Sequence, residues 1–259
     1  GKLWIGYLRI LMSCFDPNKM TNRKFIGPDK SSSGFLGWSV RDIIEDQNKN
    51  FWIGSLGSGL WKYNRHLDSF QVFTHDPSQN SLSGNKIFDI CEDRNGLLWI
   101  ATKTKGLNRY DPNIKEFKVY QNCPGDSFSL PDNHLLCIAK NDPNHLWLGS
   151  AQKGLIKFDI KQEIFYNYTT TDGLCDNMVK GILTDNAGHL WISTNDGLSR
   201  FNPENESFNT YTKEDGTQGN EFNILSYFKS KTGTMYFGGK NGLTVFDPKK
   251  KKKNPYKAK

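Results

Sequence analysis

Residues 96–112 read GLLWIATKTKGLNRYDP, a run with one tryptophan, two glycines, one arginine and an Asp-Pro pair. The same frame returns as FWIGSLGSGLWKYNR (51–65), LWLGSAQKGLIKFDI (146–160) and LWISTNDGLSRFNP (190–203). Looser copies are MYFGGKNGLTVFDP (235–248) and LWIGYLRILMSCFDP (3–17). A catalytic loop would not be copied six times in one chain, so the run is a structural unit.

The copies have a regular period that covers nearly all of the 259 residues. Their marker aromatics are spaced 44 to 48 residues apart and are Trp4, Trp52, Trp99, Trp147, Trp191 and Tyr236. A period of about 40 to 50 residues is typical of propellers and solenoids. The chain is also long enough for one large all-β domain.

The unit around Trp99 predicts four short strands, at 86–93, 97–102, 106–111 and 116–121. An Asn-Gly pair between the first two is a strong hairpin signal, and Pro112 ends the third because proline cannot donate to a ladder. Four antiparallel strands per unit make a propeller blade. We therefore predict an all-β fold, a β-propeller over residues 1–248, with marker tryptophans wedged between blades. The first unit lacks its opening strand and the last lacks an outer one.

The net charge of +7 is concentrated at one end of the chain. Residues 249–259 hold seven of the 34 basic residues, which leaves 27 basic and 27 acidic residues in 1–248. A nucleic-acid-binding domain would carry its basic stripe on a folded face, so we expect no nucleic-acid partner. The lysine-rich segment 249–259 is interpreted as a tail or linker to a further domain.

A family resemblance rests on NSLSGNKIFDICEDRNGLLWIATKTKGLNRYDP (80–112). The string resembles the two-component regulator propeller repeat: a Ser-Leu start, a strand ending in acidic residues, Asn/Asp-Gly, Leu-Trp-Ile and Gly-Leu-x-Arg-Tyr/Phe-Asp-Pro. Units at 81–112, 129–159 and 173–203 match nearly every element. The resemblance implies a propeller of seven blades, of which six markers are visible, and YLRILMSC (7–14) departs from the expected turn.

The resemblance also implies a function and a location. It indicates the periplasmic sensor region of a hybrid histidine kinase from Bacteroides-like bacteria, which often detects glycan breakdown products. Such regions precede a β-sandwich, a membrane helix and a kinase. No phosphoacceptor or receiver motif occurs here, so we expect no enzyme activity and no cofactor in this segment. A lyase or hydrolase, and an interaction scaffold or homodimer without a small ligand, are the alternatives.

One set of candidate ligand-binding residues is basic. It occupies the same place in successive third strands, three residues after a glycine, and comprises Lys62, Arg109, Lys157 and Arg200. These side chains either cover neighbouring blades with their aliphatic stems or form a partial ring for an acidic sugar. Trp38, Trp61 and Phe128 are candidate stacking surfaces, although burial is the preferred interpretation of each.

A second set lies in the polar connectors between blades, at 74–86, 121–134 and 169–178, where binding residues concentrate. The candidates there are Asn85, Asn133, His134 and Asn177. The asparagines recur just before a first strand, so turn capping competes with sugar binding. His145 and His189 also share a blade position, and we expect no metal site because equivalent positions on adjacent blades are separated. No catalytic residue is predicted.

Overall fold

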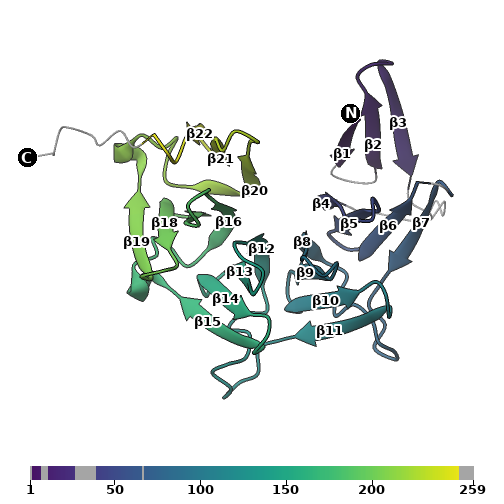
Figure 1. The fold of residues 1–259 in the computed structure, drawn as a ribbon, viewed down its shortest axis with the longest axis horizontal. Coiled ribbons are helices and arrows are strands. Elements are labelled where there is room, and N and C mark those ends of the chain that lie inside the picture. The colour runs from purple at the N-terminus through teal and green to yellow at the C-terminus, as the bar shows by residue number, and fades with distance from the viewer. Residues whose placement is uncertain (1, 7–10, 27–38, 66, 251–259) are drawn as a thin grey trace, which may run out of the picture.

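A computed structural model describes residues 2–6, 11–26, 39–65 and 67–250. The chain forms six antiparallel sheets, each a blade of consecutive strands (Figure 1). Blade 1 contains β1 (Leu3–Gly6), β2 (Leu11–Asp16) and β3 (Thr21–Ile26); blade 2 contains β4 (Val40–Glu45), β5 (Phe51–Ser55), β6 (Leu60–Asn64) and β7 (Ser69–Phe73). Blade 3 contains β8 (Ile87–Glu92), β9 (Leu98–Thr102), β10 (Leu107–Asp111) and β11 (Glu116–Tyr120).

The remaining blades repeat this order. Blade 4 contains β12 (Leu135–Lys140), β13 (His145–Ser150), β14 (Leu155–Asp159) and β15 (Ile164–Tyr168); blade 5 contains β16 (Val179–Thr184), β17 (Leu190–Thr194), β18 (Leu198–Asn202) and β19 (Ser207–Tyr211). Blade 6 contains β20 (Phe222–Lys229), β21 (Met235–Gly239) and β22 (Gly242–Phe246). Helix in the described chain is limited to two 3-10 turns, η1 (Thr170–Asp172) and η2 (Lys213–Asp215), so the all-β prediction is confirmed.

The blades lie side by side along an arc (Figure 1). Inner strands β4, β8, β12, β16 and β20 contact one another around the centre. Blade 1 lacks an inner strand and blade 6 lacks an outer one among the described residues, as the repeat pattern predicts. The arc is open between blades 1 and 6, and a seventh blade stays a prediction. Residues 251–259 of the predicted tail, and the candidate Trp38, lie outside the described residues.

Each marker tryptophan is a wedge between two blades, as predicted. The ring of Trp99 lies 5.5 Å from that of Phe158 in blade 4, and Trp147 lies 5.4 Å from Phe201 in blade 5. The other junctions repeat the contact, with centroid distances of 4.5 to 5.7 Å, through the pairs Trp4 with Tyr63, Trp52 with Tyr110 and Trp191 with Phe246. Because neighbouring blades cover both faces, β5, β9 and β17 are buried along their whole length.

An aspartate holds the hairpin before the wedge. The carboxylate of Asp93 accepts hydrogen bonds from the backbone N–H of Asn95 and Leu97 and from the Trp99 indole, at 2.8 to 3.0 Å. Asp46 and Asp185 bond Trp52 and Trp191 in the same way. Blade 4 has Asn141 at this position, and the buried indole nitrogen of Trp147 has no partner there.

Close packing requires the glycine of the Gly-Leu pair that opens the third strand in blades 2, 3 and 4. Gly106 has φ of +74°, and a Cβ on it would lie 2.2 Å from the carbonyl oxygen of Tyr120. Glycine adopts this left-handed conformation without steric cost. In the described part of the chain, no helix has the length and hydropathy that crossing a membrane requires.

Candidate functional site

The four predicted basic residues lie one per blade, each opposite the marker tryptophan of its own blade. The cross-strand pairs are Trp52 with Lys62, Trp99 with Arg109, Trp147 with Lys157 and Trp191 with Arg200. The Lys62 cation lies 5.1 Å from its tryptophan ring centroid, and those of Lys157 and Arg200 lie 5.9 Å from theirs. Such cation–π contacts give these side chains a packing role within the blade. Arg109 instead approaches Glu163 at 3.9 Å.

The predicted asparagines share one structural arrangement. The side-chain oxygen of Asn133 accepts the N–H of Asn122 at 2.8 Å, and its backbone carbonyl accepts the N–H of Gly106 at 3.0 Å. Each asparagine thereby closes its own connector and ties it to the glycine turn of the preceding blade. Asn85, Asn177 and Asn220 make the equivalent pairs of bonds. Asn220, which was not among the candidates, has the same place before β20.

We expect Asn133→Ala to lower the free energy of unfolding by about 1 kcal/mol, the usual contribution of one such hydrogen bond. Asn133→Asp is the matched control because it keeps an acceptor oxygen for the Asn122 N–H. Urea denaturation of both variants would measure the difference. An equal loss of stability in the two variants would contradict the role of the Asn133 side-chain oxygen in closing the connector. A loss of ligand affinity without a loss of stability would favour a binding role.

His134 lies at the start of blade 4, facing the inner strand of blade 3. Its ring packs edge-on to Phe88 with centroids 6.0 Å apart, and its Nε2 is buried without a hydrogen-bond partner. Burial lowers the pKa of the His134 imidazole below its ordinary value. The side-chain oxygens of the three predicted asparagines accept backbone N–H groups of their own connectors. His134 therefore does not share a binding site with them in this arrangement.

The candidate aromatics differ in exposure. Trp61 is buried, in agreement with the preferred interpretation of this residue, and its indole N–H donates to the Ser58 carbonyl. Phe128 is 58% exposed, so the preferred interpretation of burial is wrong for this residue. It is exposed because its connector runs along the outer edge of blade 4, where its carbonyl accepts the N–H of Phe165 at 3.2 Å.

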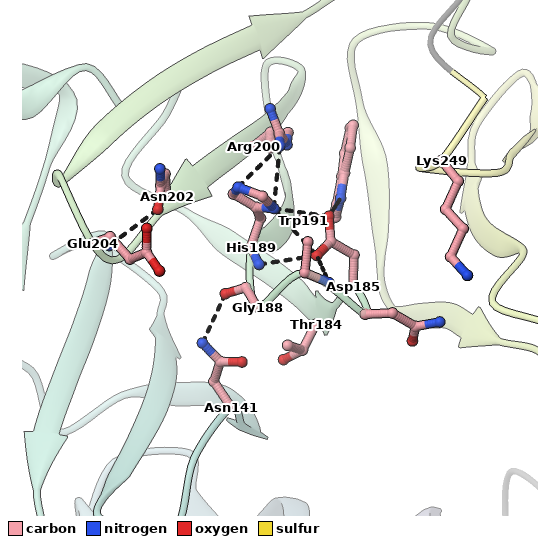
Figure 2. Close-up of polar contacts among 12 residues, drawn as sticks. Asn141, Thr184, Asp185, Gly188, His189, Trp191, Arg200, Asn202, Glu204 and Lys249 are labelled. Carbon is pink, nitrogen blue, oxygen red and sulfur yellow. Dashed lines mark hydrogen bonds and ion pairs between the residues drawn. The ribbon is translucent and has the colours of Figure 1, made fainter.

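Arg200 is distinguished from the other basic candidates by its surroundings (Figure 2). Its guanidinium Nη2 lies 3.0 Å from Nε2 of His189, whose Nδ1 lies 3.2 Å from the Asp185 carboxylate. The same Nη2 lies 3.1 Å from Nδ1, so the guanidinium lies against the imidazole ring, and an N–H on Nδ1 would donate to the Asp185 carboxylate. The hairpin of blade 5 thus orders a chain of three polar side chains.

Asp185 is the fixed end of that chain. Its carboxylate accepts the N–H groups of Ala187 and His189 at 2.8 and 3.0 Å, and the Trp191 indole at 3.1 Å. Burial alone would raise the pKa of the Asp185 carboxyl, but these hydrogen bonds outweigh burial and lower the pKa. Asp185 is therefore an ionised, saturated acceptor that serves to orient His189 and Arg200.

This chain forms one wall of a cleft of about 280 Å³ between blades 5 and 6. The lining residues are Asp185, Asn186, Ala187, His189, Arg200, Gly233, Asp247, Pro248 and Lys249. Arg200 and Lys249 supply cations, and Asp247 supplies a carboxylate on the blade 6 side. The cleft can therefore receive an anionic group beside a hydrogen-bond donor. No group of three or more His, Cys, Asp or Glu side chains in the described residues could hold a metal ion.

Several residues of the cleft could not be selected from the sequence. His189 and Arg200 are eleven residues apart, and only the pairing of β17 with β18 brings them together. Asp247 and Lys249 follow the last strand of blade 6, and the sequence alone places Lys249 in the lysine-rich tail. The one available signal was the shared position of His145 and His189. In blade 4, His145 bonds Asp142 at 2.9 Å.

Comparison with known proteins gives three kinds of similarity. Residues 81–104 and 173–196 match the model of the two component regulator propeller family. Histidine kinase P4 of Formosa agariphila is 28% identical over 257 residues, which cover 98% of this chain and 19% of that protein. The extracellular domain assigned to a hybrid two component system of B. thetaiotaomicron superposes with a TM-score of 0.79, at 22% identity, over 96% of this chain and 32% of that one.

An enzyme shares the architecture as well. Virginiamycin B lyase from Staphylococcus aureus superposes with a TM-score of 0.70 over 97% of this chain and 82% of the lyase, at 13% identity. Identities below 25% show the common fold and carry no chemistry to this chain.

The chain is a repeat protein of the β-propeller class. Its four-stranded units pack through aromatic wedges, and Asp and Asn side chains fix their turns by hydrogen bonds. The two matched repeats are similar to those of the two-component regulator propeller family. The chain spans about a fifth of the length of the curated relative and about a third of the solved chain.

Proposed function

We propose that this chain is a ligand-binding part of the extracytoplasmic sensor region of a hybrid two-component system. In this proposal the cleft between blades 5 and 6 receives an acidic sugar residue of a glycan-derived oligosaccharide. The observation that carries it is the position of Arg200, the predicted basic residue that lines this cleft, where Lys249 also lies. The family match and the histidine kinase relative support the sensor role.

The chemistry of the cleft favours a carboxylate or sulfate group on the ligand. Arg200 uses one nitrogen toward His189, which leaves other N–H donors of the guanidinium fork for a charge-assisted pair with an oxyanion. Asp247 would accept a sugar hydroxyl from the opposite wall. The volume of about 280 Å³ lies just below the range of about 300–1,000 Å³ for typical ligand sites, so it suits one sugar ring of the oligosaccharide.

A ligand in this place would touch two blades at once. Because it would bind best when blades 5 and 6 hold a particular spacing, it would shift the population of blade arrangements by its difference in affinity for them. A kinase outside this segment would read that shift. The segment itself would carry no catalytic step.

The decisive test is calorimetry with paired oligosaccharides that differ only in a uronic acid carboxylate. We expect binding of the acidic member, and a loss of affinity of about tenfold or more in Arg200→Gln, which corresponds to about 1.4 kcal/mol. Lys62→Gln is the matched control, because Lys62 has the same repeat position over Trp52 and lies in blade 2. Equal affinity for neutral and acidic sugars, or equal effects of the two variants, would overturn the proposal.

The same panel separates the alternatives. Product formation from any oligosaccharide would favour a lyase or hydrolase. Absence of both binding and turnover over the whole panel would favour an interaction scaffold or a homodimer without a small ligand.

A further inference from the structure

A second hollow lies on the outer rim, between blades 4 and 5. It has a volume of about 420 Å³ and is lined by Ser127, Phe128, Phe165, Tyr166, Asn167, Tyr168, Asp172 and Glu206. Two of its aromatic side chains face solvent, since Phe128 is 58% exposed and Tyr166 is 43% exposed. Exposed aromatic rings grouped around a hollow mark an interaction site more often than a bare surface does.

Two carboxylates share this hollow, and hydrogen bonds position both. The Tyr168 hydroxyl donates to Glu206 at 2.6 Å, and the backbone N–H of Thr169 donates to Asp172 at 2.8 Å. No lysine or arginine lines the hollow. The ion pairs of the described residues include neither Glu206 nor Asp172. The site is therefore acidic and aromatic, with its negative charge uncompensated by a direct partner.

The preceding junction shows what this arrangement binds when a cation is present. Between blades 3 and 4, the Tyr120 hydroxyl donates to Glu163 at 2.9 Å, just as Tyr168 donates to Glu206. The ammonium group of Lys118 bonds the Glu163 carboxylate at 2.6 Å and lies 5.3 Å from the Tyr120 ring centroid. The hydrogen bond from Lys118 is the main reason that the pKa of Glu163 is lowered.

Blade 4 keeps the tyrosine–glutamate pair and omits the cation. Lys118 pairs across the sheet with Arg109, and the residue that pairs in the same way with Lys157 is Tyr166. Lys157 does not replace the missing ammonium group, because its Nζ lies 5.9 Å from the centroids of the Trp147 and Tyr166 rings, and the ion pairs of the described residues include none between Lys157 and Glu206. Glu206 thus accepts a tyrosine hydroxyl as Glu163 does, but it has no ammonium partner equivalent to Lys118.

We propose that this rim hollow binds the primary ammonium group of a small ligand. The ammonium group occupies the place that Lys118 holds in the preceding junction, bonded to Glu206 and over the ring of Tyr168. Phe128 and Tyr166 flank the carbon skeleton of the ligand, and Asp172 adds a second carboxylate. Aromatic faces attract cations in this way, and more strongly where water is partly excluded. This inference does not rest on the acidic-sugar cleft, whose charge preference is opposite.

The test uses butylammonium, which reproduces the end of a lysine side chain, in a ligand-observed NMR titration of the intact chain. We expect saturable binding that 1-butanol does not show. Glu206→Gln should weaken binding by about tenfold or more, because the charge-assisted hydrogen bond is lost. Tyr166→Lys should abolish it, since the new side chain would occupy the site as Lys118 does at Glu163. Equal melting temperatures would show that both variants fold.

A gain of binding at the other junction provides an independent measurement. Lys118→Tyr removes the resident ammonium from Glu163 and should add a second, weaker butylammonium site, weaker because Arg109 lies 3.9 Å from that carboxylate. Glucosamine against N-acetylglucosamine tests whether an amino sugar carries the group. Unchanged affinity in both Glu206→Gln and Tyr166→Lys would overturn the inference, as would equal binding of butylammonium and 1-butanol.

Discussion

Trp99→Ala is expected to lower the free energy of unfolding by about 3–5 kcal/mol, the usual range for removing a buried tryptophan from a core. Trp99 is fully buried, and its ring meets Tyr120 of its own blade and Phe158 of blade 4. Its truncation leaves a cavity at a junction and removes the indole donor that Asp93 accepts at 2.9 Å. Urea denaturation followed by tryptophan fluorescence and by circular dichroism would measure the loss.

Tyr236→Ala is the matched control, because Tyr236 has the same repeat position at the end of the arc. It contacts Phe228 of its own blade at 6.1 Å, and Phe228 is largely exposed. Without a following blade among the described residues, its truncation should cost about 1 kcal/mol, the centre of the distribution for single substitutions. Similar losses at Trp99 and Tyr236 would show that the wedge contact does not stabilise the junction.

The sequence predicts the wedges because their signal is repeated and local. A tryptophan in a continuous apolar strand recurs every 44 to 48 residues. Such a strand is removed from water only if other elements cover both of its faces. The strand bounds follow from Asn95-Gly96 and Pro112 in the same way. Turn residues and prolines restrict the backbone within a few positions, so no distant contact is needed to recognise them.

Contacts between residues of different blades cannot be predicted from such local sequence signals. Asp89 has the appearance of a polar residue in a strand, IFDICED, yet its carboxylate accepts the N–H of Ile138, 49 residues later. Only the strand pairing shows that Arg200 lies beside His189. Only a comparison of equivalent positions in blades 3 and 4 shows that Tyr166 stands where blade 3 has Lys118. The exposure of Phe128 depends on the path of its connector along β15, which a 14-residue polar segment does not specify.

The inner strands carry a second stabilising feature, formed where β-bulges interrupt their pairing with the next strand. Bulges fall between Val40 and Asp42 and between Ile87 and Asp89, and they leave backbone N–H groups without a ladder partner. Asp42 accepts the N–H of Ile90 in the next blade at 3.0 Å, and Asp89 accepts that of Ile138 at 2.7 Å. The Tyr227 hydroxyl of blade 6 reaches Asp89 at 3.3 Å. Two carboxyls thus tie four blades together at the centre.

Asp89→Ala is expected to destabilise the chain by about 2–6 kcal/mol, since it leaves the buried Ile138 N–H and the Tyr227 hydroxyl without their acceptor, at about 1–3 kcal/mol each. Asp89→Asn is the control, because its amide oxygen can still accept the Ile138 N–H. The Asn variant should therefore lose less stability than the Ala variant. Equal losses would contradict the role of Asp89 as an acceptor between blades.

The pH dependence of the same variants tests the charge of this carboxyl. Burial, and next the nearby Asp42 carboxylate, raise the pKa of Asp89 well above its ordinary value, and burial raises the pKa of Asp42. Burial also raises the pKa of the neighbouring Cys137 thiol and Tyr227 hydroxyl, which stay neutral. A carboxyl with a raised pKa in the folded chain favours folding most at low pH, below about 3.9, its value in the unfolded chain. That contribution falls by up to about 1.4 kcal/mol per pH unit as the pH rises toward the folded pKa. The stability advantage of the natural chain over Asp89→Asn should therefore shrink from pH 4 upward, and parallel stability curves for the two proteins would show that Asp89 is ionised in the folded state.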